Sequence, residues 1–200
     1  MKVFSYPLGE LRANCFLLIQ DNACLIVDPG DSAEFIIEQV QRLRVHPVAI
    51  LATHGHFDHL IAVGELQLSL QTIGFFVPFY LHPADSFLLH RTRQTAEHFL
   101  EHAPIVLPPQ DINNLVEGEM SLSPFRFKVL STPGHTPGSV CLYFPDEKMI
   151  FTGDTVFKEG VGSYDHSYSD KRALFTSVNR INSLPEGTEV YPGHGETFFI

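Results

Sequence analysis

Four segments of this chain place histidine or aspartate directly after a run of apolar residues. The runs are typical of buried strands, and the polar side chains follow where each run stops, at 54–59, 135, 154 and 194. In open α/β sheets, sites gather at strand ends, where loops converge on a crevice. Four separate strands can therefore aim polar side chains at one point, and a fold for this chain has to bring those strand ends together.

The rest of the pattern alternates strands with amphipathic helices. The sequence predicts strands over residues 15–19, 23–27, 48–53, 77–81, 125–131, 140–144, 149–152 and 190–191. It predicts helices over residues 32–43, with Ser32 as N-cap, and over 60–70, 91–102 and 171–184. This alternation favours an α/β layered architecture, and 200 residues fit one domain over residues 1–200. The Asp28-Pro29-Gly30 run is expected only to end the second strand.

The first polar block has the composition of a metal site. Within six residues it holds three imidazoles and one carboxylate: His54, His56, Asp58 and His59. These are ligands for zinc and similar borderline divalent ions. One tetrahedral ion cannot use all four and still accept His135 and His194, whereas two ions can share them. Each of these residues on its own could be an ordinary loop histidine or turn aspartate. The metal-site hypothesis therefore depends on all of them occurring together.

Longer motifs around these residues resemble a known family. They are His-x-His-x-Asp-His at 54–59, Thr-Pro-Gly-His-Thr-Pro-Gly-Ser at 132–139, Thr-Gly-Asp-Thr at 152–155, and His194. Together they resemble the metallo-β-lactamase superfamily, and within it the hydroxyacylglutathione hydrolase (glyoxalase II) branch and its short bacterial relatives. The resemblance implies an αββα four-layer sandwich with two metal ions at one sheet edge.

The resemblance also implies roles for individual residues. It implies that the first ion is held by His54, His56 and His135. It implies that the second is held by Asp58, His59 and His194, with Asp154 bridging the two. Two departures separate the chain from glyoxalase II proper. Relatives carry a C-terminal helical extension, whereas this chain ends at Ile200, and Ser163 stands where relatives often have arginine in a Gly-Arg-x-Asp run. Because of these two departures, the resemblance does not identify the thiol to which the acyl group of the substrate is attached.

The resemblance and the ligand set together predict a metal-dependent hydrolase of thioesters or esters. A metal ion lowers the pKa of bound water from about 16 toward 7, and no Gly-x-Ser-x-Gly nucleophile motif is present. Asp58 is predicted both to bind the second ion and to orient the attacking water, which makes it the catalytic residue. Zinc is the expected metal, with iron and manganese as alternatives.

Other functions remain open at this stage. A persulfide dioxygenase with a single iron shares much of the motif set, and lactonase or another superfamily hydrolase activity is also possible. A non-catalytic metal-binding partner protein is the alternative outside enzymes. Aromatic residues over 72–115 are expected mainly in the core, with a pocket or lid as the alternative. Tyr164, His166 and Tyr168 are candidates to reach a ligand or else to lie in an ordinary exposed loop.

The composition restricts the classes of binding partner and the cellular compartment that we expect for this protein. Thirteen Lys plus Arg against 23 Asp plus Glu give a net charge of −10, which disfavours binding to nucleic acid. No apolar run approaches the length of a membrane span, and no signal core follows Met1. The three scattered cysteines are typical of buried thiols in a cytoplasmic protein. A small-molecule thioester or ester substrate is therefore expected, with no membrane partner.

Overall fold

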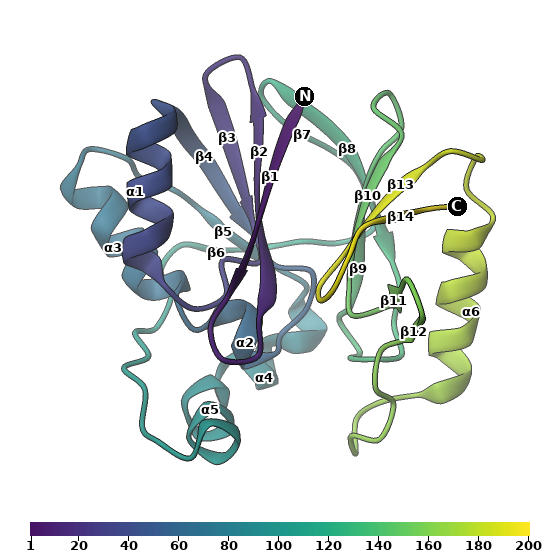
Figure 1. Cartoon of the computed structure of the whole chain (residues 1–200). Helices are drawn as coiled ribbons and strands as arrows, with labels where there is room; N and C mark the ends of the chain where they lie inside the picture. Colours follow the sequence, from purple (N-terminus) through teal and green to yellow (C-terminus); the bar gives the residue numbers. More distant parts are fainter.

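Two six-stranded sheets lie face to face in the computed structural model, which describes residues 1–200 (Figure 1). The first sheet has the spatial order β1 (Lys2–Leu8), β2 (Ala13–Gln20), β3 (Ala23–Val27), β4 (His46–Leu51), β5 (Phe79–Leu81), β6 (Ile112–Asn114). The second has the order β14 (Phe198–Phe199), β13 (Glu189–Pro192), β10 (Met149–Gly153), β9 (Val140–Phe144), β8 (Phe125–Ser131), β7 (Gly118–Leu122). A separate ribbon pairs β11 (Val156–Phe157) with β12 (Gly160–Val161).

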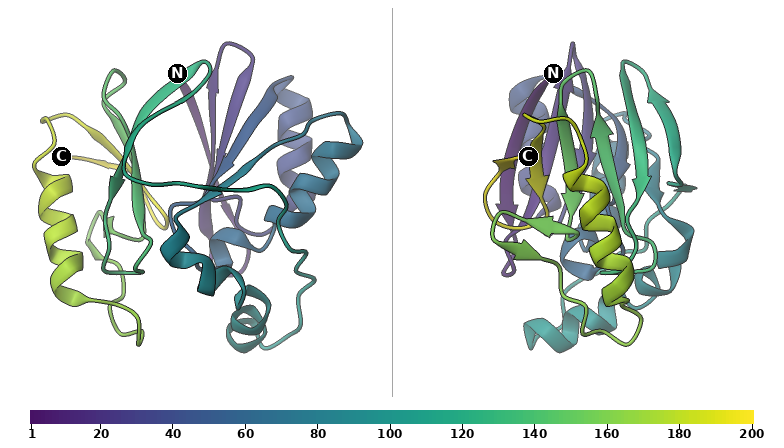
Figure 2. Two further views of the ribbon diagram at one scale, coloured as in Figure 1. Left: turned by 180° about the vertical axis from the view of Figure 1, so that it is seen from behind. Right: turned by 90° about the vertical axis from the view of Figure 1, so that its right-hand side faces the viewer.

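Helices cover the outer face of each sheet (Figures 1 and 2). The first sheet is covered by α1 (Ala33–Leu43) and α3 (Val63–Thr72), and the second by α6 (Lys171–Asn182). Four short helices lie at one end of the sandwich: α2 (Phe57–Leu60), the 3-10 turn η1 (Pro83–Asp85), α4 (Ser86–Leu89) and α5 (Thr92–Leu100). The predicted αββα four-layer sandwich is confirmed.

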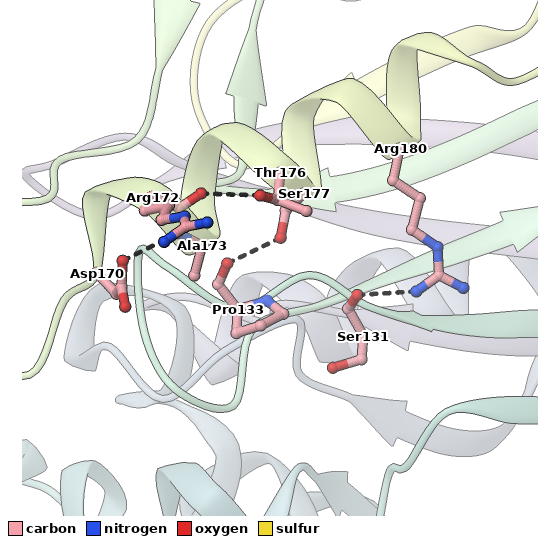
Figure 3. A pocket seen from close by; sticks show the side chains of 8 residues that line it. All are labelled: Ser131, Pro133, Asp170, Arg172, Ala173, Thr176, Ser177 and Arg180. Carbon is pink, nitrogen blue, oxygen red and sulfur yellow. Dashed lines mark hydrogen bonds between the residues drawn. The ribbon is translucent and has the colours of Figure 1, made fainter.

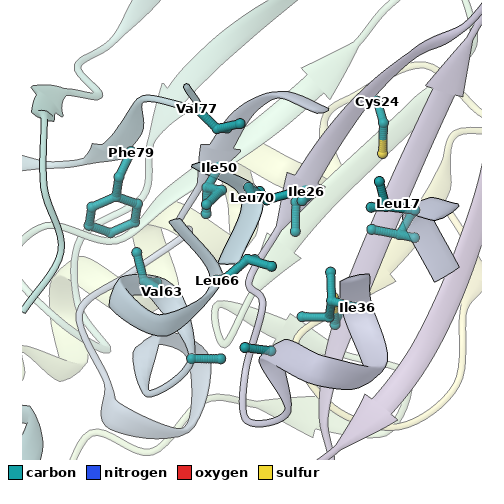
Figure 4. Packing of buried hydrophobic residues seen from close by; sticks show 14 of the residues in the cluster. Leu17, Cys24, Ile26, Ile36, Ile50, Val63, Leu66, Leu70, Val77 and Phe79 are labelled. Carbon is teal, nitrogen blue, oxygen red and sulfur yellow. The ribbon is translucent and has the colours of Figure 1, made fainter. Parts of the chain in front are cut away.

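Strands in the middle of the first sheet are apolar on both faces because both faces are covered. In β2, Leu17 packs toward the helices, while Phe16 and Leu18 pack toward the second sheet. The helix side contains Ile36 of α1 and Leu66 of α3 (Figure 4). Alternation along a strand sends successive side chains to opposite faces, so burial on both sides produces a continuous apolar run.

Strand direction gathers the polar loops at one edge. In the first sheet β3, β4, β5 and β6 pair in parallel, so their carboxyl ends share an edge. In the second sheet β10 pairs in parallel with β13, and two antiparallel pairings through β9 give β8 the same direction as β10. The loops after β4, β8, β10 and β13 therefore leave the sandwich on one side. They are the four loops that carry the predicted site residues.

Several predicted elements differ from the observed ones. The helix predicted over residues 60–70 corresponds to α3, which begins later, at Val63, because Leu60 ends a separate short helix, α2. The backbone of Gly30 explains the break, because its N–H donates to the His59 carbonyl and its carbonyl accepts from the Ala62 N–H. Ser32 does precede α1, but its side chain forms no capping hydrogen bond. The strands that were missed include β1, β7 and β14, edge strands with many exposed residues that leave a weak apolar pattern. No helix combines the length and hydrophobicity that spanning a membrane would require.

The contact between the sheets depends on an aromatic cluster around Phe151 of β10. Its ring lies 5.1 Å from Phe16 and 4.8 Å from Tyr191, centroid to centroid, and it is fully buried. We expect Phe151→Ala to lower the free energy of unfolding by about 3–5 kcal/mol, because it leaves a cavity between the sheets. Urea denaturation measures this loss. Phe76→Ala is the control, since Phe76 is 80% exposed, and an equal loss in both variants would contradict the expectation.

Candidate metal centre

All seven residues singled out in the sequence lie together at the edge where the strand ends meet. Their side-chain nitrogen and oxygen atoms form three overlapping groups within 4.8 Å: His54, His56 and His135; His54, His59 and Asp154; and Asp58, His59 and His194. The residues come from both sheets, so the site lies across the seam of the sandwich. The structure therefore brings together every predicted site residue.

Asp154 lies between the other groups. One carboxylate oxygen, Oδ2, is 3.6 Å from His135 Nε2 and 3.7 Å from His194 Nε2. The other, Oδ1, is 3.5 Å from His59 Nε2. Asp58 approaches only one side of the site, with Oδ2 3.2 Å from His194 Nε2 and 3.6 Å from His59 Nε2. A carboxylate in the position of Asp154 can contact two ions, whereas Asp58 can contact one.

In four of the imidazoles one nitrogen has a hydrogen-bond partner and the other points into the site. Nδ1 of His54 contacts Thr53 Oγ1 at 3.1 Å, and Nδ1 of His59 contacts Asp28 Oδ2 at 3.0 Å. Nδ1 of His135 donates to the Ser163 carbonyl at 2.7 Å. His56 has the reverse orientation: Nε2 contacts the Tyr168 hydroxyl at 2.8 Å, and Nδ1 lies 2.9 Å from His135 Nε2. Such partners fix ring orientation and leave the second nitrogen to bind a metal.

Three of the atoms that point inward have no hydrogen-bond partner in the protein. His54 Nε2, His59 Nε2 and Asp154 Oδ1 are buried and form no hydrogen bond. Leaving buried polar atoms unsatisfied costs about 1–3 kcal/mol each, and three adjacent cases are exceptional in a folded protein. Divalent metal ions bound by these atoms would satisfy all three. The donor set of imidazole nitrogens and carboxylate oxygens therefore fits divalent metal ions.

Burial and charge divide the imidazoles into two kinds. Burial, reinforced by neighbouring histidines, lowers the pKa of His54 and lowers the pKa of His56 to about 2, so both are neutral at pH 7. Burial acts in the same direction on His59, but the surrounding carboxylates of Asp58, Asp28 and Asp154 outweigh it and raise the pKa of His59 to about 10. In the metal-free site His54 and His56 are therefore neutral, whereas His59 is an imidazolium.

Asp28 is a functional residue that the sequence analysis missed. It is fully buried, and its carboxylate accepts hydrogen bonds from the Thr53 N–H and hydroxyl at 2.7 Å each, besides contacting His59. It follows β3, whose parallel partner β4 carries the first histidine block. The signal that identified the other residues, a carboxylate directly after a buried strand, was present here too, but the residue was interpreted only as a strand terminator.

Asp85 is a second residue that was missed, and it lies between the two loops that carry His56 and His135. Its Oδ2 accepts from the Gly55 N–H at 2.8 Å and from the Thr136 hydroxyl at 2.7 Å, and its Oδ1 accepts from the Gly138 N–H at 2.7 Å. The approach is so close that a Cβ on Gly55 or Gly138 would overlap Asp85. Asp85 therefore sets the separation of the two loops, and no pattern in the sequence marks it.

Asn14 performs a similar task for the last loop. Its side-chain amide donates to the carbonyls of Pro192 and Gly195 at 2.9 and 3.0 Å, and its backbone N–H donates to the Gly193 carbonyl at 2.7 Å. These bonds run from β2 of the first sheet to the loop that carries His194. Gly193 itself has no room for a side chain, because a Cβ there would overlap Asp154 Oδ1.

A pocket of about 470 Å³ opens above the site. His56, Asp58, His135, Asp154 and His194 line its floor. Its walls are formed by Leu11, Phe57, Leu88, Arg91, Thr95, Phe99, Ser163, His166 and Tyr168. Of the three candidates in the 164–168 loop, His166 and Tyr168 reach the pocket, whereas Tyr164 packs beside Phe175 of α6.

The aromatic residues of the 72–115 segment divide between the two interpretations. Phe79 is in the core as predicted, and Phe75 packs against it. Phe99 lines the pocket instead, stacked on Phe57 with the ring centroids 5.7 Å apart. Phe76 belongs to neither group, since it is exposed. Phe99 differs because α5 lies outside the two sheets, so its half-exposed ring packs on Phe57 and not in the core.

A second cavity lies along α6 and has no part in the site (Figure 3). Its polar groups satisfy one another: the Ser177 hydroxyl donates to the Pro133 carbonyl at 2.8 Å, and Arg180 donates to the Ser131 carbonyl at 3.1 Å. Arg180 also pairs with Glu117 at 2.9 Å. This cavity therefore holds no unsatisfied group comparable to those at the strand ends.

Replacing Asp85 tests its role in holding the two loops. We expect Asp85→Asn to lower the free energy of unfolding by on the order of 2 kcal/mol, because the new NH₂ group cannot accept the hydrogen bonds of the loops. It should also weaken metal binding, which competition with a chelator measures. Asp146→Asn, at an exposed aspartate in the β9–β10 turn, is the control. Unchanged metal affinity in Asp85→Asn would show that the loops hold their spacing without this carboxylate.

Metal affinity should rise with pH. His59 has a pKa raised to about 10 in the metal-free protein, so at neutral pH it holds a proton that an ion has to displace. Raising the pH removes this competition, and the apparent zinc affinity should increase about tenfold per pH unit for each displaced proton between pH 6.5 and 8.5. Chelator competition at several pH values, corrected for the chelator's own protonation, measures the slope. A flat profile would contradict proton displacement.

Comparison with known proteins agrees with this geometry. The sequence model of the metallo-beta-lactamase superfamily matches residues 8–194. The chain is 35% identical over 198 residues to "Probable metallo-hydrolase YqgX" of Bacillus subtilis, covering 98% of this chain and 90% of that protein. It is 32% identical to "Hydroxyacylglutathione hydrolase GloC" of Haemophilus influenzae, covering 98% and 91%.

Solved structures give the same result. TTHA1623, crystallised in a di-iron-bound form, superposes with a TM-score of 0.89 at 38% identity and covers 98% of this chain and 94% of its own. The BLEG-1 B3 metallo-beta-lactamase superposes with a TM-score of 0.88 at 33% identity, covering 99% and 94%. The fold, the clustered histidines and aspartates, and the family match over nearly the whole chain lead to one conclusion: this protein belongs to the metallo-β-lactamase superfamily.

Proposed function

We propose that this protein is a dinuclear metallo-hydrolase that uses water to cleave a thioester or ester. The observation that carries the proposal is the position of Asp154 between two triads, one of three imidazoles and one of Asp58, His59 and His194. A mononuclear centre, as in the persulfide dioxygenase alternative, needs only one triad. The second triad here is complete and contains the buried, unpartnered His59 Nε2.

In this proposal the first ion is held by His54, His56 and His135, the second by Asp58, His59 and His194, and Asp154 contacts both. Bound divalent ions would supply water of lowered pKa and positive charge for the carbonyl oxygen of the substrate. Zinc, iron and manganese all suit imidazole and carboxylate ligands, and the di-iron form of TTHA1623 supports a two-ion site in this fold. Zinc remains the proposed metal.

The protein's own residues support water as the nucleophile. All three cysteines are buried away from the pocket, and burial raises the pKa of Cys24 and of Cys141 to about 12, so no thiolate is available. Asp58 faces the pocket, and although burial alone would raise its pKa, His59 and His194 lower it, so the carboxylate is ionised. Asp58 can therefore accept a hydrogen bond from the attacking water and orient it toward the acyl carbon. A bond forms between the water oxygen and the acyl carbon, and the carbon–sulfur or carbon–oxygen bond breaks. One proton of the water passes to the leaving sulfur or oxygen and the other is released, giving a carboxylate and a thiol or alcohol.

The 32% identity to a hydroxyacylglutathione hydrolase supports thioesters as the first substrates to test. The purified protein should be loaded in turn with zinc, iron and manganese and given S-D-lactoylglutathione. We expect a kcat/KM above about 10⁴ M⁻¹s⁻¹ with at least one metal, within the normal range for enzymes. Background rates with two ions bound per chain would exclude this thioester and favour other esters, lactones or β-lactams. Oxygen uptake with one bound iron would favour the dioxygenase.

Asp58→Ala tests the catalytic role directly. We expect a loss of at least 100-fold in kcat, because positioned proton acceptors typically contribute factors of 10²–10⁴. Metal content, measured by elemental analysis, separates loss of an ion from loss of the oriented water. Asp165→Ala is the control, since Asp165 is exposed and does not line the pocket. If Asp58→Ala binds two ions and keeps near-normal turnover, Asp58 is not the catalytic residue.

A further inference from the structure

The side chains that line the pocket are of two chemical kinds. Leu11, Phe57, Leu88 and Phe99 are apolar. Arg91, His166 and Tyr168 are polar and take no part in the proposed metal centre. Among these polar side chains, Tyr168 and Arg91 have hydrogen-bond donors that no other group in the protein accepts.

Tyr168 has a spare proton. Its hydroxyl lies 2.8 Å from His56 Nε2. When His56 Nδ1 binds a metal ion through its lone pair, as in the proposed function, the one hydrogen of the neutral imidazole is on Nε2, which donates it to the Tyr168 oxygen. The hydroxyl proton of Tyr168 then has no partner in the protein. The ring is held by Phe87, 5.4 Å away edge to face, and by His166, stacked at 5.2 Å, so the hydroxyl is fixed beside the site.

Arg91 supplies the positive charge. It is the only lysine or arginine that lines the pocket, and its guanidinium lies 6.0 Å from the centroid of Phe87, the ring that also contacts Tyr168. Arg93, two residues further along, is paired with Glu97 at 2.8 Å, and Lys158 is paired with Glu196 at 2.7 Å. Arg91 has no carboxylate within ion-pair distance, although the protein has a net charge of −10.

We propose that Arg91 and Tyr168 form a recognition subsite for a carboxylate carried by the substrate. A guanidinium fork and one hydroxyl provide donors for the two oxygens of a carboxylate, and the apolar side chains of the same pocket accommodate the carbon chain. The inference rests on the proposed hydrolase function, and it narrows the substrates to thioesters or esters with an anionic group near the scissile bond. The residues come from the 86–100 segment and the 164–168 loop, not from any of the metal-binding blocks.

Two matched substrates test the subsite: the acetyl thioesters of 3-mercaptopropionate and of 3-mercaptopropionamide, which differ only in the charge of the thiol part. We expect the protein to prefer the carboxylate by about tenfold or more in kcat/KM. Arg91→Gln should abolish the preference through KM, and Tyr168→Phe should reduce it while keeping the ring contacts. Arg93→Gln and Tyr164→Phe are the matched controls and should retain it. An equal preference in wild type and Arg91→Gln, or none in wild type, would overturn the proposal.

A binding experiment separates this inference from the hydrolase proposal. The thioether CH₃–CO–CH₂–S–CH₂CH₂–COO⁻ and its amide cannot be hydrolysed, and calorimetry gives their affinities for the metal-loaded protein. If neither thioester is cleaved but the wild type binds the carboxylate thioether at least tenfold more tightly and Arg91→Gln does not, the subsite stands and the hydrolase assignment falls. If both thioesters are cleaved at equal kcat/KM, the hydrolase assignment stands and the subsite falls.

Discussion

The structure depends on hydrogen bonds that cross between the two sheets at the strand ends. The Val140 N–H donates to the Thr53 carbonyl at 2.8 Å, and Asn14 joins β2 to the loop of His194. Asp85 adds a buried carboxylate between the loops of His56 and His135. Apolar contact holds the sheets together but is non-directional, whereas these bonds define relative position. The candidate metal site takes its residues from both sheets, so the relative position of the sheets has to be fixed. Ligand atoms in such a site have to be placed within a few tenths of an ångström.

Charge at the site is balanced by protons in the absence of metal. Three carboxylates, Asp28, Asp58 and Asp154, surround His59, and they hold it as an imidazolium against the effect of burial. His54 and His56 have histidine neighbours and stay neutral. One region of the site therefore has a positive charge where a divalent ion would displace a proton, and the other has neutral imidazoles with lone pairs. Metal binding at such a site would release protons.

Much of this arrangement was predictable from the sequence, for physical reasons that differ between residues. The seven candidate ligands follow apolar runs, and strand direction alone sends them to one edge, so their convergence could be expected from 54–59, His135, Asp154 and His194. Asp28 obeys the same rule and could have been found. Asp85 and Asn14 could not, because each acts on backbone groups distant in sequence, to which any acceptor or amide in the right place would bind. The break between α2 and α3 was equally hidden, since it depends on the backbone of Gly30.

The position of α4 and α5 has an evolutionary consequence. Residues 86–100 follow directly after Asp85, contribute no strand to either sheet and no candidate ligand, yet they supply Leu88, Arg91, Thr95 and Phe99 to the pocket. Arg91 and Phe99 are exposed, so substitutions at these two positions alter the pocket lining without entering the core. These positions can diverge between relatives while the strand-end residues stay constant, so one scaffold can acquire new substrates by changing a few side chains of a single helical segment.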